Sequence, residues 1–248
     1  MEKLHHIPSP FVVGTVVEST RQSALEAVEA SFEHGAHAAE LTLSALYFES
    51  KNPSAYAEFG ILGRPVYTTF RRAAFMKIFG GTFADLEAVD DSARMDFQWQ
   101  VFQQGLAGFD IEADTFDPNE EEWTEDPAAV QKQKSLIQKV HDQGGSIIMS
   151  WHPPRKLTFE QAAEAVETLR ERGADIVKIV EQTYTLSEVF DSLEISTRLR
   201  RQFPDFPFIF LALGEETAQF RHLMTHFGCS SILSRPPTGG NQLAVHPP

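Results

Sequence analysis

The chain has a single cysteine and no long apolar run, and each shortage excludes a class of protein. Cys229 cannot form an internal disulfide, so nothing in the sequence requires an oxidising compartment. No run of about 18 apolar residues is present, and the N-terminus lacks the apolar core of a signal peptide. We therefore expect a soluble, cytoplasmic protein that makes no contact with a membrane.

Basic residues are also scarce. The sequence has 21 Lys and Arg against 35 Asp and Glu, which gives a formal charge of -14. A field of this sign repels a nucleic-acid duplex, so we expect no nucleic-acid partner. An anionic small substrate is compatible with this charge only if the few arginines gather in one pocket.

Apolar residues, by contrast, are plentiful enough for a full-sized core. They make up 42% of the 248 residues, which excludes an intrinsically disordered chain and a disulfide-stapled miniprotein. The length suits a single domain, and we expect that domain to span residues 1–248.

Short β-like runs alternate with longer amphipathic segments along the chain. The runs predict eight strands, at residues 11–17, 38–45, 65–71, 108–114, 146–152, 175–181, 208–213 and 231–235. The segments between them predict helices near residues 24–32, 84–104, 127–143, 158–172, 185–202 and 215–227, with only a short helix around 54–59. This alternation favours an α/β fold, a (β/α)8 TIM barrel, over an open doubly wound sheet.

Two parts of the chain do not fit a regular barrel. Residues 236–248 follow the last predicted strand and are too few, and too rich in Pro and Gly, for an eighth helix. Something else must cover that wall, and a partner subunit in a homodimer is our candidate. The acidic stretch 117–127 is interpreted as a solvated loop in preference to a lid.

No motif for a nucleotide or a metal is evident. Neither G-x-G-x-x-G nor G-x-x-x-x-G-K-[ST] follows a predicted strand, which removes support for dinucleotide and P-loop binding. His222 and His226 have helical i, i+4 spacing but no accompanying carboxylate, so we interpret them as surface residues. We expect no metal site.

A lysine lies within the apolar, β-branched run at residues 174–180. Lys178 shares one face of the strand with Ile176 and Val180, because side chains alternate along a strand. If it points into the barrel, burial lowers the pKa of its ammonium group, and a neutral amine can attack a carbonyl to form a Schiff base. The alternative is an edge lysine whose amine reaches water, which the length and apolarity of the run disfavour.

A histidine ends the predicted strand 146–152. His152 stands at the carboxyl end of that strand, which in an α/β barrel is the catalytic face. Histidine exchanges protons near neutral pH, so His152 is a candidate acid–base group. Its signal is weak on its own, because the sequence has nine histidines.

Together these two positions resemble the type I 3-dehydroquinate dehydratase family. That family has its catalytic histidine in an S-x-H stretch that ends strand five and its Schiff-base lysine in A-D-I-x-K-I on strand six. The matching residues here are Ser150-Trp151-His152 and Ala174-Asp175-Ile176-Val177-Lys178-Ile179. The resemblance implies that Lys178 forms the imine and that His152 moves the protons.

Further matches follow in order along most of the chain. They include a strand-two glutamate, a T-F-R on strand three, a D-x-E on strand four, an arginine after strand seven and a closing loop with Ser and Gln. The resemblance implies substrate-binding roles for six matched residues, which are Glu40, Arg71, Glu112, Arg221, Thr238 and Gln242. Arg221 corresponds to the arginine that binds the substrate carboxylate.

The chain also departs from the family pattern. The family has a glutamate after T-F-R, in a K-E-G-G stretch, that orients the catalytic histidine, whereas Phe75 or Phe79 stands there in this chain. Thr42 and Ser44 replace the arginine and aspartate of the family's strand-two E-x-R-x-D. We therefore expect a flatter or more apolar carbonyl substrate. The carboxylates left as candidates to orient His152 are Glu112, Asp114 and Glu181.

The residues and the resemblance together indicate a cofactor-independent Schiff-base lyase. It would eliminate water, or an equivalent group, from a carbonyl substrate that carries a carboxylate. We expect no metal or organic cofactor, because the lysine itself supplies the electrophilic activation. Three alternatives stay open: a genuine 3-dehydroquinate dehydratase, an aldolase or other C–C lyase with the same imine chemistry, and a non-catalytic binding barrel.

Overall fold

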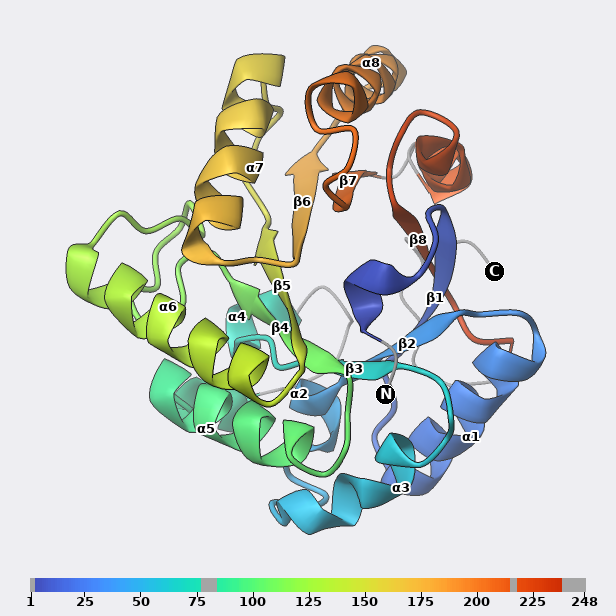
Figure 1. Ribbon diagram of the computed structural model, residues 1–248, viewed down its shortest axis with the longest axis vertical. Coiled ribbons are helices and arrows are strands. Elements are labelled where there is room, and N and C mark those ends of the chain that lie inside the picture. The colour runs from blue at the N-terminus through green and yellow to red at the C-terminus, as the bar shows by residue number, and fades with distance from the viewer. Residues whose placement is uncertain (1–2, 77–83, 215–217, 238–248) are drawn as a thin grey trace.

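Eight parallel strands form the centre of the molecule. The computed structural model describes residues 3–76, 84–214 and 218–237. The strands are paired in the order β7-β6-β5-β4-β3-β2-β1-β8, which makes a nearly closed ring (Figure 1). Their bounds are β1 (Phe11–Val16), β2 (Ala38–Thr42), β3 (Val66–Thr69), β4 (Gly108–Glu112), β5 (Ser146–Trp151), β6 (Ile176–Gln182), β7 (Phe208–Leu213) and β8 (Ser231–Ser234). The predicted (β/α)8 barrel is confirmed.

The ring closes between β7 and β8 through one serine. The backbone N–H of Ser230 donates to the carbonyl of Phe208 at 2.8 Å. The backbone N–H of Phe208 donates in turn to the Ser230 hydroxyl at 3.0 Å. The side chain thus replaces a ladder bond at the point where the two strands begin.

Helices of the expected length cover most of the outside of the ring. They are α1 (Arg21–Glu33), α5 (Asp91–Phe102), α6 (Pro127–Asp142), α7 (Phe159–Arg172) and α8 (Leu186–Gln202). Thr158 and Thr185 begin α7 and α8 with capping boxes, in which the threonine and the third helical residue satisfy each other's backbone N–H. Gly173 ends α7 with a φ of 113°, a left-handed conformation that glycine adopts without strain.

Shorter helices occupy the remaining connections. They are α2 (Leu43–Leu46), α3 (Ala57–Gly60), α4 (Ala73–Met76) and the 3-10 helices η1 (Leu4–His6), η2 (Pro53–Tyr56), η4 (Ala84–Ala88) and η5 (Ala218–Thr225). Three predicted elements are wrong in part. The second strand stops at Thr42 because the chain turns into α2. The predicted helix at 84–104 is the 3-10 helix η4 followed by α5, and the described part of the predicted helix at 215–227 contains the 3-10 helix η5. Most of the segment predicted to lack an eighth helix, residues 238–248, lies outside the described residues.

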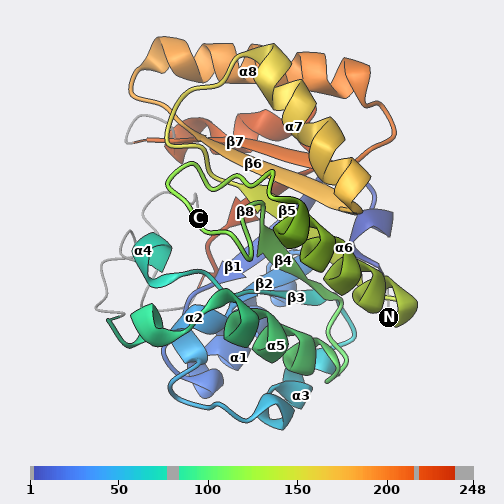
Figure 2. The ribbon, with the colours of Figure 1, turned by 90° about the vertical axis from the view of Figure 1, so that its left-hand side faces the viewer.

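The N-terminal segment closes one end of the barrel. Leu4 is 1% exposed, and its backbone N–H donates to the hydroxyl of Ser146, the first residue of β5, at 3.2 Å. This blue segment and α4, which follows the carboxyl end of β3, lie at opposite ends of the strands (Figure 2). The carboxyl ends of the strands are therefore the end at which loops can build a site. No described helix is long and apolar enough to cross a membrane.

Candidate active site

A buried lysine–carboxylate pair lies inside the barrel. The Lys178 Nζ of β6 is 3.1 Å from Glu40 Oε2 of β2 and 3.6 Å from Asp110 Oδ2 of β4. The Tyr67 hydroxyl of β3 donates to the same Glu40 oxygen at 3.0 Å. Lys178 therefore points inward, as predicted, but its amine lies among carboxylates.

The ionisation of this cluster follows from its charges. Burial alone would raise the pKa of Glu40, but Lys178 and Arg71 outweigh it and hold that pKa below its ordinary value. Burial raises the pKa of Tyr67 well above its ordinary value, and the neighbouring Glu40 raises it further. Glu40 is thus a carboxylate and Tyr67 a phenol that donates to it.

A buried arginine joins this pair to β5. Arg71, just after β3, donates to Asp110 Oδ2 and to the Ser150 hydroxyl, both at 2.7 Å, and lies 3.8 Å from Glu112 Oε1. Burial opposes its charge, but these carboxylates raise the pKa of Arg71 above its ordinary value. Ser150 is the register neighbour of Lys178 on the adjacent strand. The predicted substrate-binding arginine is therefore held beside the lysine by three strands.

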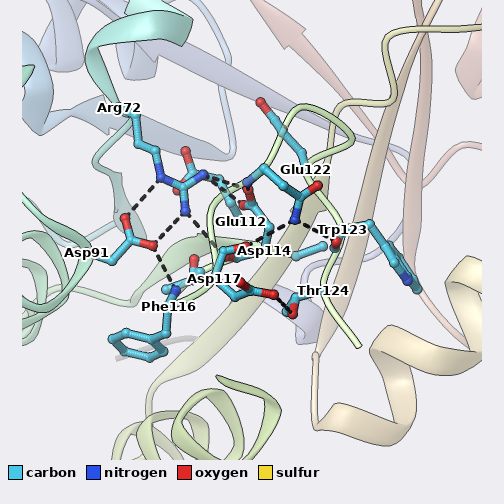
Figure 3. Close-up of polar contacts among 12 residues, drawn as sticks. Arg72, Asp91, Glu112, Asp114, Phe116, Asp117, Glu122, Trp123 and Thr124 are labelled. Carbon is cyan, nitrogen blue, oxygen red and sulfur yellow. Dashed lines mark hydrogen bonds and ion pairs between the residues drawn. The ribbon is translucent and has the colours of Figure 1, made fainter. Parts of the chain in front are cut away.

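Two further arginines extend the network, and sequence reasoning missed both. Arg94 of α5 is 1% exposed and lies 2.9 Å from Glu112 Oε2. Arg72 lies between Asp91 at 2.6 Å and Asp114 at 2.8 Å, as Figure 3 shows. A signal for Arg94 did exist. It shares the helix face of the buried Phe97, Gln98 and Val101, where a charge is costly without a partner.

His152 is held by a carboxylate that the sequence analysis did not consider. Its Nδ1 lies 2.8 Å from Glu122 Oε2, in the loop between β4 and α6. That loop, residues 113–126, includes most of the stretch interpreted as solvated, and the interpretation is wrong for Glu122, Trp123 and the buried Thr124. Alternation along β5 puts His152 on the side of Ser150, the strand neighbour of Lys178.

The three carboxylates considered from sequence face other groups. Glu112 contacts Arg94 and Arg71, and Asp114 contacts Arg72. Glu181 accepts hydrogen bonds from Lys156, Ser192 and the backbone N–H of Leu157. None of them is the partner of His152 among the described contacts.

Comparison with known proteins identifies the family of the chain. The model of the type I 3-dehydroquinase family matches residues 12–235. The chain belongs to this family. The resemblance seen in the sequence is thereby confirmed. No curated protein sequence matches the chain.

Solved 3-dehydroquinate dehydratases share the fold. The enzyme from Geobacillus kaustophilus superposes with a TM-score of 0.78 at 15% identity, over 100% of this chain and 91% of its own. The enzyme from Clostridium difficile has a TM-score of 0.74 at 15% identity, over 95% of this chain and 88% of its own. The enzyme from Enterococcus faecalis has 0.70 at 18% identity, over 94% and 93%. At these identities the likeness shows the barrel alone.

Three other positions match the dehydroquinase family. The structure describes Arg221, but Thr238 and Gln242 lie outside the described residues. Arg221 lies in η5, is buried and donates from Nε to the Ala212 carbonyl at 3.3 Å. Burial lowers the pKa of Arg221 to about 10. Phe79 also lies outside the described residues. The predicted roles of Thr238 and Gln242 stay predictions.

An aromatic ring marks this chain's departure from the dehydroquinase pattern. Phe75 of α4 lies beside His152, with ring centroids 4.8 Å apart, and 5.3 Å from the Arg71 guanidinium. It also lines a cavity of about 340 Å³ together with Arg72, Glu112 and Glu122. Ser44 lies in α2, where it is 1% exposed and its hydroxyl donates to the Arg71 carbonyl at 2.9 Å.

Two buried hydroxyls are additional candidate substrate donors. Thr15 and Thr69 have hydroxyls with no hydrogen-bond partner among the described residues. Thr15 is the register neighbour of Glu40, and Thr69 is that of Asp110, so both share the inward face. Sequence reasoning had no signal for them, since threonine is common in strands. No three described His, Cys, Asp or Glu side chains are grouped to hold a metal ion.

Proposed function

We propose that this member of the type I 3-dehydroquinase family is a lyase that forms a Schiff base through Lys178. The observation that carries the proposal is the position of the Lys178 amine, which is buried inside the barrel 3.1 Å from Glu40. His152, at the end of the adjacent strand, supplies an imidazole on the same side as Ser150. An amine and an imidazole on neighbouring strands are the groups that imine-based elimination requires.

The chemistry follows from these groups. The amine must lose a proton before it attacks, and Glu40 and Asp110 are the acceptors closest to it. Attack of Lys178 on the carbonyl carbon, followed by loss of water, gives an iminium that withdraws electrons from the adjacent carbon. His152 removes a proton from that carbon, and the electron pair forms the enamine. The enamine pair then re-forms the iminium as the C–O bond to the β-hydroxyl breaks, and His152 gives its proton to the departing hydroxyl, which leaves as water. A second water hydrolyses the iminium, which releases the unsaturated carbonyl product and regenerates the amine. No metal or organic cofactor takes part in this proposal.

The substrate is proposed to be a carbonyl compound with a carboxylate. Arg221 would bind the carboxylate through its planar fork, and Arg71, Glu112, Thr238 and Gln242 would contribute hydrogen bonds. Phe75 beside His152 supports a substrate with fewer hydroxyl groups than 3-dehydroquinate, because a phenyl ring cannot replace a polar partner. The substrate is therefore proposed to be flatter or more apolar than that of the namesake enzyme.

Borohydride trapping tests the lysine. Reduction with a bound carbonyl substrate should add the reduced substrate's mass to the peptide that contains Lys178, and Lys178→Ala should abolish the adduct. Lys156→Ala is the control, because that amine pairs with Glu181. An adduct that persists in Lys178→Ala contradicts the proposal.

A genuine 3-dehydroquinate dehydratase is the second candidate. The observation that favours it is the Glu122 carboxylate at His152, which supplies the charge lost with the family glutamate. Conversion of 3-dehydroquinate to 3-dehydroshikimate at about 10⁴ M⁻¹s⁻¹ or more would establish this candidate and reject the diverged substrate. We expect an efficiency several decades lower, because each lost polar contact costs roughly tenfold to a hundredfold.

The remaining alternatives are separated by a panel of carbonyl acids. Cleavage of a substrate into two smaller products would indicate an aldolase. If no compound of the panel is trapped on the protein, a non-catalytic binding barrel is favoured.

We further propose a cytoplasmic homodimer whose partner subunit covers the barrel wall after β8. Light scattering at micromolar concentration tests the dimer, which a monomer mass would contradict.

A further inference from the structure

We propose that Glu122 is a positioning residue that sets the orientation and tautomer of His152. This inference rests on the proposed role of His152 as the proton-transfer group. The contact that carries it joins His152 Nδ1 and Glu122 Oε2 at 2.8 Å, with the histidine side chain 10% exposed. At this distance the imidazole and the carboxylate are directly hydrogen-bonded, with no water between them.

The loop that bears Glu122 is anchored on both sides of it. Trp123 packs on Trp151 with ring centroids 4.9 Å apart, and the Trp151 Nε1–H donates to the Glu121 carbonyl at 2.7 Å. Arg172 of α7 donates to the carbonyl of Thr124 at 2.6 Å. These contacts attach the residues next to Glu122 to α7 and to Trp151, the last residue of β5, which His152 follows directly.

The backbone at Glu122 is strained in a way that matches this role. Its φ is +50°, a left-handed conformation that a residue with a Cβ adopts only at an energetic cost. Asn119 helps to impose this turn, since its side-chain amide donates to the carbonyls of Asp117 and Trp123. This strained backbone conformation is the one that places the Glu122 carboxylate beside the His152 imidazole.

The contact decides which nitrogen of His152 faces the substrate. A carboxylate can only accept, so it requires the proton of a neutral imidazole to reside on Nδ1 and leaves the lone pair on Nε2. Phe75 contacts the same ring from α4, at a centroid distance of 4.8 Å. With the ring restrained by two separate elements, Nε2 is the nitrogen left to exchange protons with a substrate.

In this chain the carboxylate that orients the histidine follows β4, whereas in the family pattern it follows β3. Phe75 occupies the region after β3 where the family pattern has its glutamate, and Glu122 reaches the histidine from the loop after β4. Glu112 is the last residue of β4 and Asp114 follows closely, but arginines hold both carboxylates. Glu122 is therefore the carboxylate of the described residues that is available to the imidazole.

Three variants of the full chain test the proposal. Glu122→Ala removes the acceptor, Glu122→Gln keeps an amide oxygen that accepts from Nδ1–H without the charge, and Glu125→Gln is the control for an exposed acid in the same loop. Nitrogen NMR of the labelled imidazole reads the tautomer without any substrate. Turnover and borohydride trapping are measured in parallel on a substrate that labels Lys178.

The expected result separates the three variants. Wild type and Glu122→Gln should show a protonated Nδ1, and Glu122→Ala a mixture of tautomers. In Glu122→Ala, kcat should fall by about 10²- to 10⁴-fold with little change in KM and with imine trapping retained, because loss of a carboxylate that orients a catalytic histidine costs up to about 10⁴ in kcat. Glu122→Gln should be intermediate, and Glu125→Gln should equal wild type.

An unchanged tautomer in Glu122→Ala would overturn the proposal, as would a kcat within twofold of wild type. If Glu122→Ala fails to fold, the isosteric Glu122→Gln carries the test, and a wild-type kcat in that variant together with free ring rotation by NMR rejects a positioning role. Failure of the proposed function looks different. No carbonyl acid would then be trapped on Lys178 in the wild type, whereas the NMR result would still report on Glu122.

Discussion

At the residue scale, Lys178 and Glu40 depend on each other for their charged forms. Each is buried, and the pair at 3.1 Å offsets the cost of removing both charges from water. Lys178→Met should therefore leave Glu40 without its nearest cation and destabilise the protein by about 3–5 kcal/mol in urea unfolding. The double variant with Glu40→Gln should recover much of this loss, and a double variant no more stable than the single would contradict the pairing.

The same pair makes the free energy of unfolding depend on pH. The pKa of Glu40 is below its ordinary value of 4.5 in the folded protein, so the unfolded chain binds its proton first as the pH falls. The stabilisation is complete above about pH 4.5 and is lost as the pH falls through the folded value. Acid unfolding of the wild type should therefore be steeper than that of Glu40→Gln.

Residues of the site differ in how far the sequence reveals them. Lys178 stands out because a charge within an apolar strand is rare, and its inward direction follows from the alternation of side chains. Glu122 is one of six acidic residues between positions 117 and 126, and no periodicity distinguishes it from the others. Its position depends on a left-handed backbone and on indole packing far along the chain, which no local pattern encodes.

At the element scale, Arg72 joins three segments of the catalytic end. It follows β3 and bridges Asp91 at the start of α5 to Asp114 in the loop after β4. Asp114 is fully buried at its side chain, and burial raises its pKa although Arg72 opposes the shift. The arginine is thus one of the cations that attach the loop to the barrel, together with Arg172.

Removal of this cation should loosen the loop. Arg72→Ala should cost about 2–4 kcal/mol, somewhat less than the roughly 3–5 kcal/mol of a broken fully buried pair, because Arg72 is one-fifth exposed. It should also speed proteolytic cleavage within residues 117–126. Arg198→Ala, which breaks the exposed pair with Glu160, is the control and should change stability by less than about 0.5 kcal/mol. Equal losses in the two variants would refute the bridging role.

The predictability of the elements follows from their signals. Helices α6, α7 and α8 agree with the sequence prediction to within one residue at each end, because Asp126, Thr158 and Thr185 cap their starts. The segment of η5 has an amphipathic pattern too, yet it forms a 3-10 helix. Hydrophobic periodicity indicates which face of a helix is buried. Over eight residues it does not distinguish an α-helix from a 3-10 helix.

At the scale of the whole molecule, η1 closes the amino end of the barrel through a titratable residue. His5 Nδ1 lies 3.3 Å from Asp175 Oδ1 and 3.3 Å from the Ser146 hydroxyl. Burial lowers the pKa of His5, Asp175 opposes this, and the nearby His6, Lys3 and His141 lower it further. The folded pKa is therefore below the ordinary value of 6.5, and the unfolded chain takes up the proton first.

Acid should weaken this closure at a milder pH than the one that protonates Glu40. Stability should fall as the pH drops from about 7 to about 5, since proton binding favours the unfolded state wherever the folded pKa is the lower one. His5→Asn should reduce the loss of Tm over this range, whereas the exposed His222→Asn should leave it unchanged. A steeper loss in His5→Asn would show that the sign is reversed.

The net charge of -14 affects the rate at which a charged substrate reaches the protein, and it does not determine the fold. Within the described network, four cations face a larger number of carboxylates. The cations are Lys178, Arg71, Arg72 and Arg94, and the carboxylates are Glu40, Asp91, Asp110, Glu112, Asp114 and Glu122. The site region thus adds no positive field that would offset the charge of the whole chain, although Arg221 is proposed to bind the carboxylate at short range.

A carboxylate substrate should therefore react faster as salt screens this repulsion. Raising the ionic strength from about 0.01 M to about 0.15 M shortens the Debye length from about 30 Å to about 8 Å. The value of kcat/KM should rise about two- to fivefold for the acid and stay constant for its uncharged methyl ester. A fall for the acid would mean that Arg221 and its neighbours focus a positive potential at the barrel mouth, and that the local field, not the net charge, governs the encounter.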